Sequence, residues 1–179
     1  MTPAQLATLK AYIASVPYLN SQGVDGDSLN VIVDTLNAPT ADYYVWRSST
    51  PMPDISNAIT WASLTPSDAA DGTALFTNRA LICQAKQINL QMLVQGQQSV
   101  ASGKALIRGG FQDALQNLPS GVGGANLGAG WATVKTAMTR FATLGEKVLT
   151  TGAGTAATPA DLGFEGMLTR NDVDTARRS

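Results

Sequence analysis

The strongest pattern of apolar and polar positions in this chain lies between residues 73 and 94. No glycine or proline interrupts the stretch, and most of its residues favour a helix. Apolar residues recur at three-to-four spacing or near-multiples of it, which places them on one helical face: Phe76, Ala80, Cys83, Leu90 and Val94. That face is widened into a broad band by Leu75, Ile82 and Leu93. We therefore predict one helix of about 33 Å, at about 1.5 Å per residue, around which the other segments pack.

Shorter patterns on both sides of this stretch predict further helices. Before it, helices are expected over residues 3–15, with Thr2 and Gln5 in a capping box, over about residues 28–36, and after Asp54. After it, residues 100–118 and 131–149 carry apolar residues in helical register. The aromatic residues 43–46 fit either a short extended piece or the first turn of a helix, and we expect an irregular segment. Glycine-rich residues 119–130 are predicted to form a flexible loop.

These patterns predict an all-α fold, a helical bundle around one long helix, with a body over residues 1–150 and an extended arm over residues 151–179. Residues 150–158 are rich in Thr, Gly and Ala, and apolar residues beyond them are separated by glycines. A last helical turn can begin at a cap around Thr169. The arm carries apolar side chains but no core of its own. It must therefore dock either on its own body or on a neighbouring subunit, and removing it is expected to leave a folded body that no longer assembles.

The composition combines many apolar residues with few charged ones. Hydrophobic residues make up 44% of the chain and charged residues only 14%, against about a quarter charged in typical domains. A weakly charged surface is tolerated where neighbouring subunits cover it, although simple compositional drift is the alternative. The net charge of −1 offers no basic stripe for gripping duplex DNA.

The chain lacks the residues of the common catalytic and metal sites. It contains no histidine, and its single cysteine, Cys83, lies on the apolar face of the predicted helix, where we expect a buried thiol. Residues Gly103 and Lys104 do not complete a phosphate-binding loop, and the glycine-rich loop follows no strand. Asp25 and its neighbours have too few carboxylates for calcium and fit a turn before a helix. The only two glutamates lie on a helix and on the arm, so no glycosidase pair is expected.

No enzyme, cofactor or metal is therefore expected. The first residues lack the basic-then-apolar pattern of an export signal, and no apolar run reaches about 18 residues. We expect no export signal and no membrane span, with synthesis in a reducing cytoplasm.

Two stretches of the chain resemble small virion structural proteins of tailed bacteriophages. The first begins Met-Thr-Pro-Ala-Gln-Leu-Ala-Thr-Leu-Lys and runs through the second helix to Tyr44-Val45-Trp46. The second comprises Glu146-Lys-Val148, Thr151-Gly-Ala-Gly-Thr155, Thr158-Pro159, Glu165-Gly166 and Asn171-Asp172-Val173. The resembling segments are packing and turn motifs at the two ends of the chain, and no catalytic residue is carried over from the family.

Helical virion proteins of this size resemble head–tail connector adaptors. The resemblance implies a neck protein that forms a ring with copies of itself, twelvefold if it follows a portal, and that contacts the portal protein and a tail or nozzle protein. DNA would pass through without specific binding, and no membrane would be involved. An adaptor's arm commonly reaches the portal, which points to the partner-binding residues Leu162, Phe164, Met167, Leu168, Arg170, Val173 and Arg177. A head-decoration or minor tail protein, or a chaperone-like protein outside the virion, would fit the same features.

Overall fold

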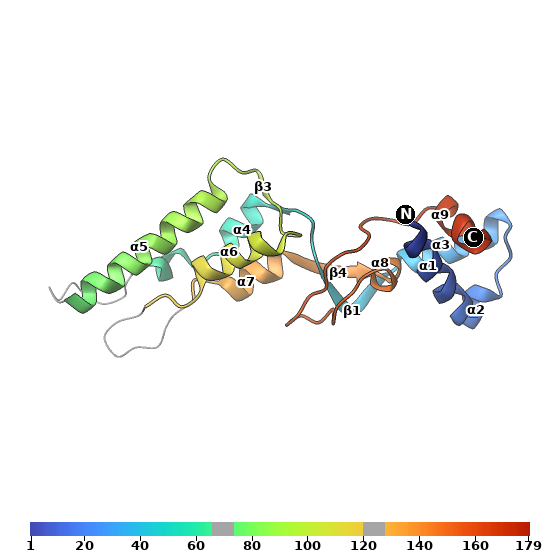
Figure 1. Cartoon of the computed structure of the whole chain (residues 1–179), viewed down its shortest axis with the longest axis horizontal. Coiled ribbons are helices and arrows are strands. Elements are labelled where there is room, and N and C mark those ends of the chain that lie inside the picture. Colours follow the sequence, from blue (N-terminus) through green and yellow to red (C-terminus); the bar gives the residue numbers. More distant parts are fainter. Residues whose placement is uncertain (66–73, 120–127) are drawn as a thin grey trace. The chain divides into compact units, whose positions relative to one another are not determined.

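The computed structural model describes residues 1–65, 74–119 and 128–179, with the side chains of residues 74–76 excepted (Figure 1). The start of the predicted long helix at Thr73 and most of the glycine-rich loop lie outside the described residues. Within them the chain forms nine α-helices, a 3-10 helix and four strands in two antiparallel pairs. The predicted all-α fold is therefore wrong, because the protein is mixed α/β.

The chain is divided into two compact units. Unit 1 comprises Met1–Trp46 and Thr139–Ser179, and unit 2 is the continuous segment Arg47–Met138. A long helix does occupy most of the predicted stretch, as α5 (Ala74–Val94), but it belongs to unit 2 alone. Unit 1 has a hydrophobic core of its own, so a single bundle around the long helix does not describe the fold. The chain divides at residues 46 and 138 rather than at 150, since residues 151–179 are part of unit 1.

Unit 1 contains five helices: α1 (Pro3–Ser15), α2 (Pro17–Asn20), α3 (Gly26–Asn37), α8 (Leu144–Val148) and α9 (Arg170–Arg178). The predicted bounds of α1 and its capping box between Thr2 and Gln5 are confirmed. Helix α3 begins earlier than expected, because Asp25 accepts the amides of Asp27 and Ser28 at its start. The core of unit 1 is formed by Leu9, Ile13, Leu19, Leu29, Ile32, Leu36, Leu149, Leu168, Val173 and Ala176.

A two-stranded ribbon lies beside these helices in unit 1. Strand β1 (Pro39–Trp46) pairs antiparallel with β4 (Thr139–Thr143), with Val45 opposite Arg140. On its other edge, β1 exchanges backbone hydrogen bonds with Ala160, whose amide donates to the Tyr44 carbonyl at 2.9 Å. Residues 43–46, expected to be irregular, are therefore part of strand β1, which is hydrogen-bonded on both edges.

The single helix predicted over residues 131–149 is wrong. The segment forms α7 (Trp131–Ala137), strand β4 and the short helix α8. Residues 139–143 are Thr-Arg-Phe-Ala-Thr, rich in β-branched and aromatic side chains that suit a strand. Thr143 then begins α8 with a capping box to Glu146. Apolar spacing alone suggested a helix because pairing with β1 depends on residues far away in the sequence.

Unit 2 buries apolar side chains from each of its helices. Besides α5 and α7 it contains α4 (Met52–Ala58), the 3-10 helix η1 (Trp61–Leu64) and α6 (Ala105–Leu115), with β2 (Thr50–Pro51) paired to β3 (Ser99–Val100). Helix α5 packs on α6 and η1. The fully buried side chains include Ile55, Leu64, Leu90, Phe111, Leu115, Leu118, Val134 and Met138. Buried Arg108 donates to the Ser102 and Gly103 carbonyls, which holds the loop before α6.

Substituting Gly154 tests how closely the C-terminal segment packs against Tyr43 of β1. The φ of Gly154 is +63°, and a Cβ there would lie 2.1 Å from a ring carbon of Tyr43. We expect Gly154→Ala to destabilise unit 1 by about 1–3 kcal/mol, because it adds a clash to the backbone strain. Gly96→Ala is the matched control for backbone strain: its φ is +71°, and nothing lies within 4 Å of its Cβ position. Equal losses in chemical unfolding of the two variants would contradict the predicted contact with Tyr43.

Candidate functional site

The predicted partner-binding residues lie in the C-terminal segment of unit 1, and they differ widely in exposure. Leu168 and Val173 are buried, with 2% and 0% of each residue exposed, and belong to the core of unit 1. Leu162 and Phe164 are half-buried. Leu162 packs against the Val45 cluster, and Phe164 packs against the helical core. Met167 alone among the apolar members is largely exposed, at 63%.

Polar contacts hold the same segment against the first helices of unit 1. The side-chain amide of Asn37 accepts the Leu168 amide at 2.8 Å and donates to the Leu168 carbonyl at 2.9 Å. Arg170 donates to the side-chain oxygen of Asn30 at 2.8 Å. Arg177 donates to two backbone carbonyls in the loop before α3, at residues 22 and 23. Thr169 caps α9 through a capping box with Asp172, which confirms the predicted helix start.

The structure therefore brings the C-terminal segment onto its own chain, which is one of the two alternatives that the sequence left open. Both predicted cationic residues, Arg170 and Arg177, have partners within unit 1. Binding of another protein by these residues stays a prediction. Of the apolar set, Met167 presents most of its side chain to solvent, so it is the member best placed for such a contact.

The structure also brings together Arg140 and the two glutamates, Glu146 and Glu165, that the sequence placed on separate segments. Arg140 on β4 holds Glu146 of α8 through two hydrogen bonds of 2.7 Å, and its guanidinium lies 3.6 Å from Glu165. Glu146 also accepts the backbone amides of Thr143, at 2.9 Å, and Gly166, at 3.0 Å. This cluster ties the loop at Gly166 to the β4–α8 junction. The available sequence signal was the Thr143-x-x-Glu146 spacing of a capping box.

The electrostatics of this cluster indicate a structural role. Burial would raise the pKa of Glu146, but the hydrogen bonds from Arg140, Gly166 and Thr143 outweigh it and the pKa is lowered. The hydrogen bonds that Arg140 donates to Glu146 raise the pKa of Arg140. Both groups are therefore charged at neutral pH. A general acid needs a pKa near the operating pH, so this pair is suited to holding the fold and not to proton transfer.

Apart from Met167, a second set of exposed residues was not recognised from the sequence. Large apolar side chains with at least 43% of the residue exposed are Tyr18, Val24, Trp61, Leu81, Ile82, Ile88, Met92, Leu106, Phe141 and Met167. Four of them lie on α5, where Ile82 was expected to face inward. Cys83 and Leu90 of the predicted face are buried as expected. Periodicity could not decide between two apolar faces of one helix, because both have helical spacing.

The remaining sequence candidates have structural roles in the described residues. Asp25 caps α3, and hydrogen bonds from the Ser28 side chain and backbone lower its pKa. Burial raises the pKa of the Cys83 thiol, which disfavours the reactive thiolate. No group of three or more acidic, cysteine or histidine side chains with metal-binding geometry occurs in residues 1–65, 74–119 and 128–179. Among the described helices, none combines the length and apolarity that crossing a bilayer requires.

Comparison with known proteins adds no family assignment. No family model, no curated protein and no solved structure matches this chain.

Proposed function

We propose that this chain is a structural, non-enzymatic protein of a tailed-bacteriophage virion. It acts as a head-to-tail adaptor, forming a ring with copies of itself beneath the portal and joining the portal to the tail. The resemblance of the terminal motifs supports the virion part of this proposal. The single structural observation that carries the assembly part is the set of large apolar side chains exposed on a chain with only 14% charged residues.

Exposed apolar side chains mark interaction sites when they gather on one element. In unit 2 they gather on α5, and in unit 1 they include Phe141, whose ring lies 4.6 Å from that of Tyr44 on the β1–β4 ribbon. Each unit thus offers apolar surface to a neighbour. The net charge of −1 suits a ring through which DNA passes without being gripped.

The proposal predicts that the protein is a stoichiometric part of the particle. Quantitative mass spectrometry of purified virions is expected to find it at the same copy number as the portal protein, or at a simple multiple of it. Absence from virions would overturn the proposal and favour a chaperone-like protein. A copy number of hundreds, matching the major capsid protein, would favour a head-decoration protein instead.

Deleting the gene distinguishes a neck adaptor from the remaining alternatives, such as a minor tail protein. We expect filled heads and finished tails that do not join, seen as separate structures by electron microscopy. Complementation with the intact gene is the control and should restore complete particles. Joined particles without this protein would contradict an adaptor role and leave a dispensable minor tail protein as the better account.

A further inference from the structure

The solvent face of α5 carries an apolar seam. Leu81, Ile88 and Met92 have 57%, 57% and 75% of each residue exposed, and Ala85 between them is also exposed. The steps from one to the next are four, three and four residues, which is the spacing by which one helix packs along another. We refer to these four residues as the α5 seam.

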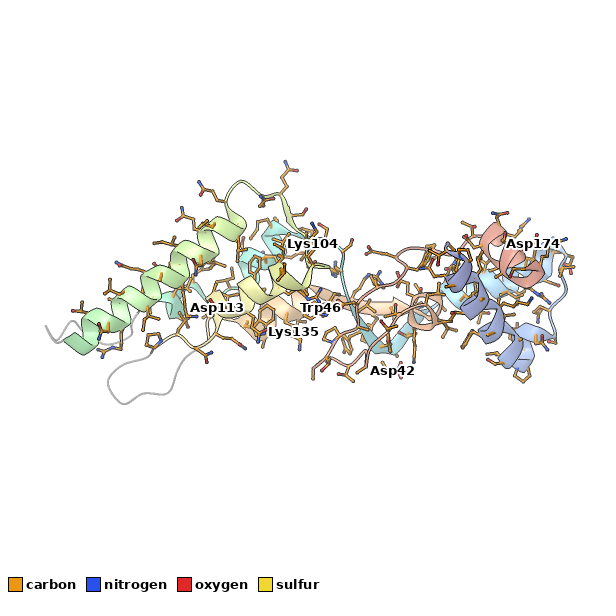
Figure 2. The ribbon with its side chains drawn as sticks, viewed as in Figure 1. Asp42, Trp46, Lys104, Asp113, Lys135 and Asp174 are labelled. Atoms are coloured by element: carbon orange, nitrogen blue, oxygen red, sulfur yellow. The ribbon has the colours of Figure 1, made fainter. Side chains whose placement is uncertain are left out.

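The opposite side of α5 already has its partners in unit 2. Cys83 and Leu90 are buried there. Lys86 reaches α6, where its Nζ donates to the backbone carbonyl of Asp113. Asp113 is labelled on α6 in Figure 2. Gln87 donates to the Leu64 carbonyl of η1 at 3.0 Å. The α5 seam is therefore a second apolar face, distinct from the one that packs within the unit.

The positions beside the seam carry no charge. The charged residues of α5 are Arg79, which is buried, and Lys86, which is paired with Asp113. The other exposed positions are the neutral residues Thr77, Asn78, Ile82, Gln84, Asn89 and Gln91. The solvent face of a surface helix normally carries charged side chains. This face is therefore suited to being covered.

Neutral flanks favour a second copy of the same chain as the cover. When a helix packs on its own copy about a two-fold axis, a charge close to that axis is brought near its like, which is destabilising. Asn and Gln side chains both donate and accept, so identical copies satisfy one another. The helix itself offers a charged partner no unpaired charge, and the nearby Asp113 carboxylate of α6 already pairs with Lys86 at 3.5 Å, which argues against a hetero-complex guided by electrostatics.

The surface around the seam also has the shape for self-association. A hollow of about 370 Å³ lies beside Met92 and is lined by Asn89, Leu93, Gly110 and Asp113. A hollow of about 330 Å³ includes Trp61, Leu64 and Gln91 in its lining. A projecting Met92 and hollows next to it occur on the same unit, so the projection of one copy can enter a hollow of another.

We infer that the α5 seam is the contact through which one copy of this chain packs helix-on-helix against a second copy. The inference rests on the proposed function only in that a ring requires contacts between copies. A contact between the same surface of two copies gives a dimer, so the seam supplies one contact of the assembly and a ring requires a second surface as well.

The first test compares charge introduced on and off the seam. Size-exclusion chromatography with light scattering should find wild-type protein self-associated. The double variant Ile88→Lys and Met92→Lys should weaken association by at least about a hundredfold, since each central apolar anchor contributes about tenfold or more. Leu106→Lys is the matched control: Leu106 is 92% exposed on α6 and outside the seam, so it should keep the wild-type mass. Circular dichroism must show wild-type helix content in both variants.

The second test places a thiol on the seam. The natural chain has one cysteine, Cys83, which is 2% exposed, so it serves as the blank for crosslinking. Ile88→Cys treated with a flexible bismaleimide should give covalent dimers, whereas Leu106→Cys should give none above the blank.

Each result has one interpretation. The role of the α5 seam as a contact between copies would be overturned by wild-type protein that stays monomeric up to its solubility limit. It would also be overturned by seam variants that keep the wild-type mass. Absence of the protein from virions, together with seam-dependent dimers, would overturn the phage assignment and leave the seam intact. The two failures are therefore distinguishable.

Discussion

Shortening Leu168 to alanine is expected to destabilise unit 1 by about 3 kcal/mol, whereas the same change at Met167 should cost less than about 0.5 kcal/mol. The two residues are neighbours in sequence, but Leu168 is 2% exposed and Met167 is 63% exposed. Leu168 packs so closely on α8 that a Cβ on Gly145 would lie 2.6 Å from its Cδ1. Leu168→Ala therefore leaves a cavity, and Met167→Ala does not.

The measurement is urea unfolding followed by far-ultraviolet circular dichroism, with the midpoint and slope compared for both variants. Similar small losses for both substitutions would show that the C-terminal segment is detached from unit 1. The same contacts change the expectation for the truncated chain. Removing residues 151–179 also removes Val173 and Ala176 from the core of unit 1, so unit 1 should lose its fold and the body predicted over residues 1–150 should not fold as a whole.

Replacing Arg140 by leucine is expected to destabilise unit 1 by about 3–5 kcal/mol, because the Glu146 carboxylate, 1% exposed, loses its charged partner. Glu146→Gln should cost less, about 1.5–3 kcal/mol, since the amide keeps the volume but loses the charge-assisted hydrogen bonds. Glu165→Gln is the matched control, because Glu165 is 39% exposed and 3.6 Å from the same arginine. That substitution should cost at most about 1 kcal/mol.

The ion pair also predicts how stability depends on pH. The folded-state pKa of Glu146 lies below its ordinary value of 4.5, so the unfolded chain binds the proton more readily. The pair therefore stabilises the fold above about pH 4.5, and this contribution is lost as the pH falls through the folded-state pKa. We expect the stability difference between wild type and Glu146→Gln to shrink on acidification over that window. A difference that stays constant from pH 7 to pH 3 would contradict the assigned role of Glu146.

The local signals in the sequence were sufficient for the elements whose determinants lie close together. The start of α1 follows from the Thr2 and Gln5 spacing, and that of α9 from Thr169 and Asp172. The β1–β4 ribbon could not be predicted in this way. Its register depends on Val45 meeting Arg140, and no local pattern encodes a partner so distant in the sequence.

The same contrast between local and long-range determinants applies to the candidate site. The sequence identified the apolar residues of the C-terminal segment, but it could not decide whether Leu168 and Val173 face their own chain. It kept Glu146 and Glu165 apart, because their common contact with Arg140 exists only after β4 and the C-terminal segment have folded together. It also assigned α5 a single apolar band, since spacing shows which residues share a face and not which face is covered.

The division of unit 1 into two stretches of sequence determines the order in which a ribosome can complete the molecule. Unit 2 is continuous over Arg47–Met138, so every residue of it has been synthesised before β4 emerges. Strand β1 is made early, yet its partners β4 and Ala160 follow only afterwards. At about 5–20 residues per second the nascent β1 waits on the order of 5–20 s with an unpaired edge. During that interval the edge of β1 is open to pairing with another newly made copy.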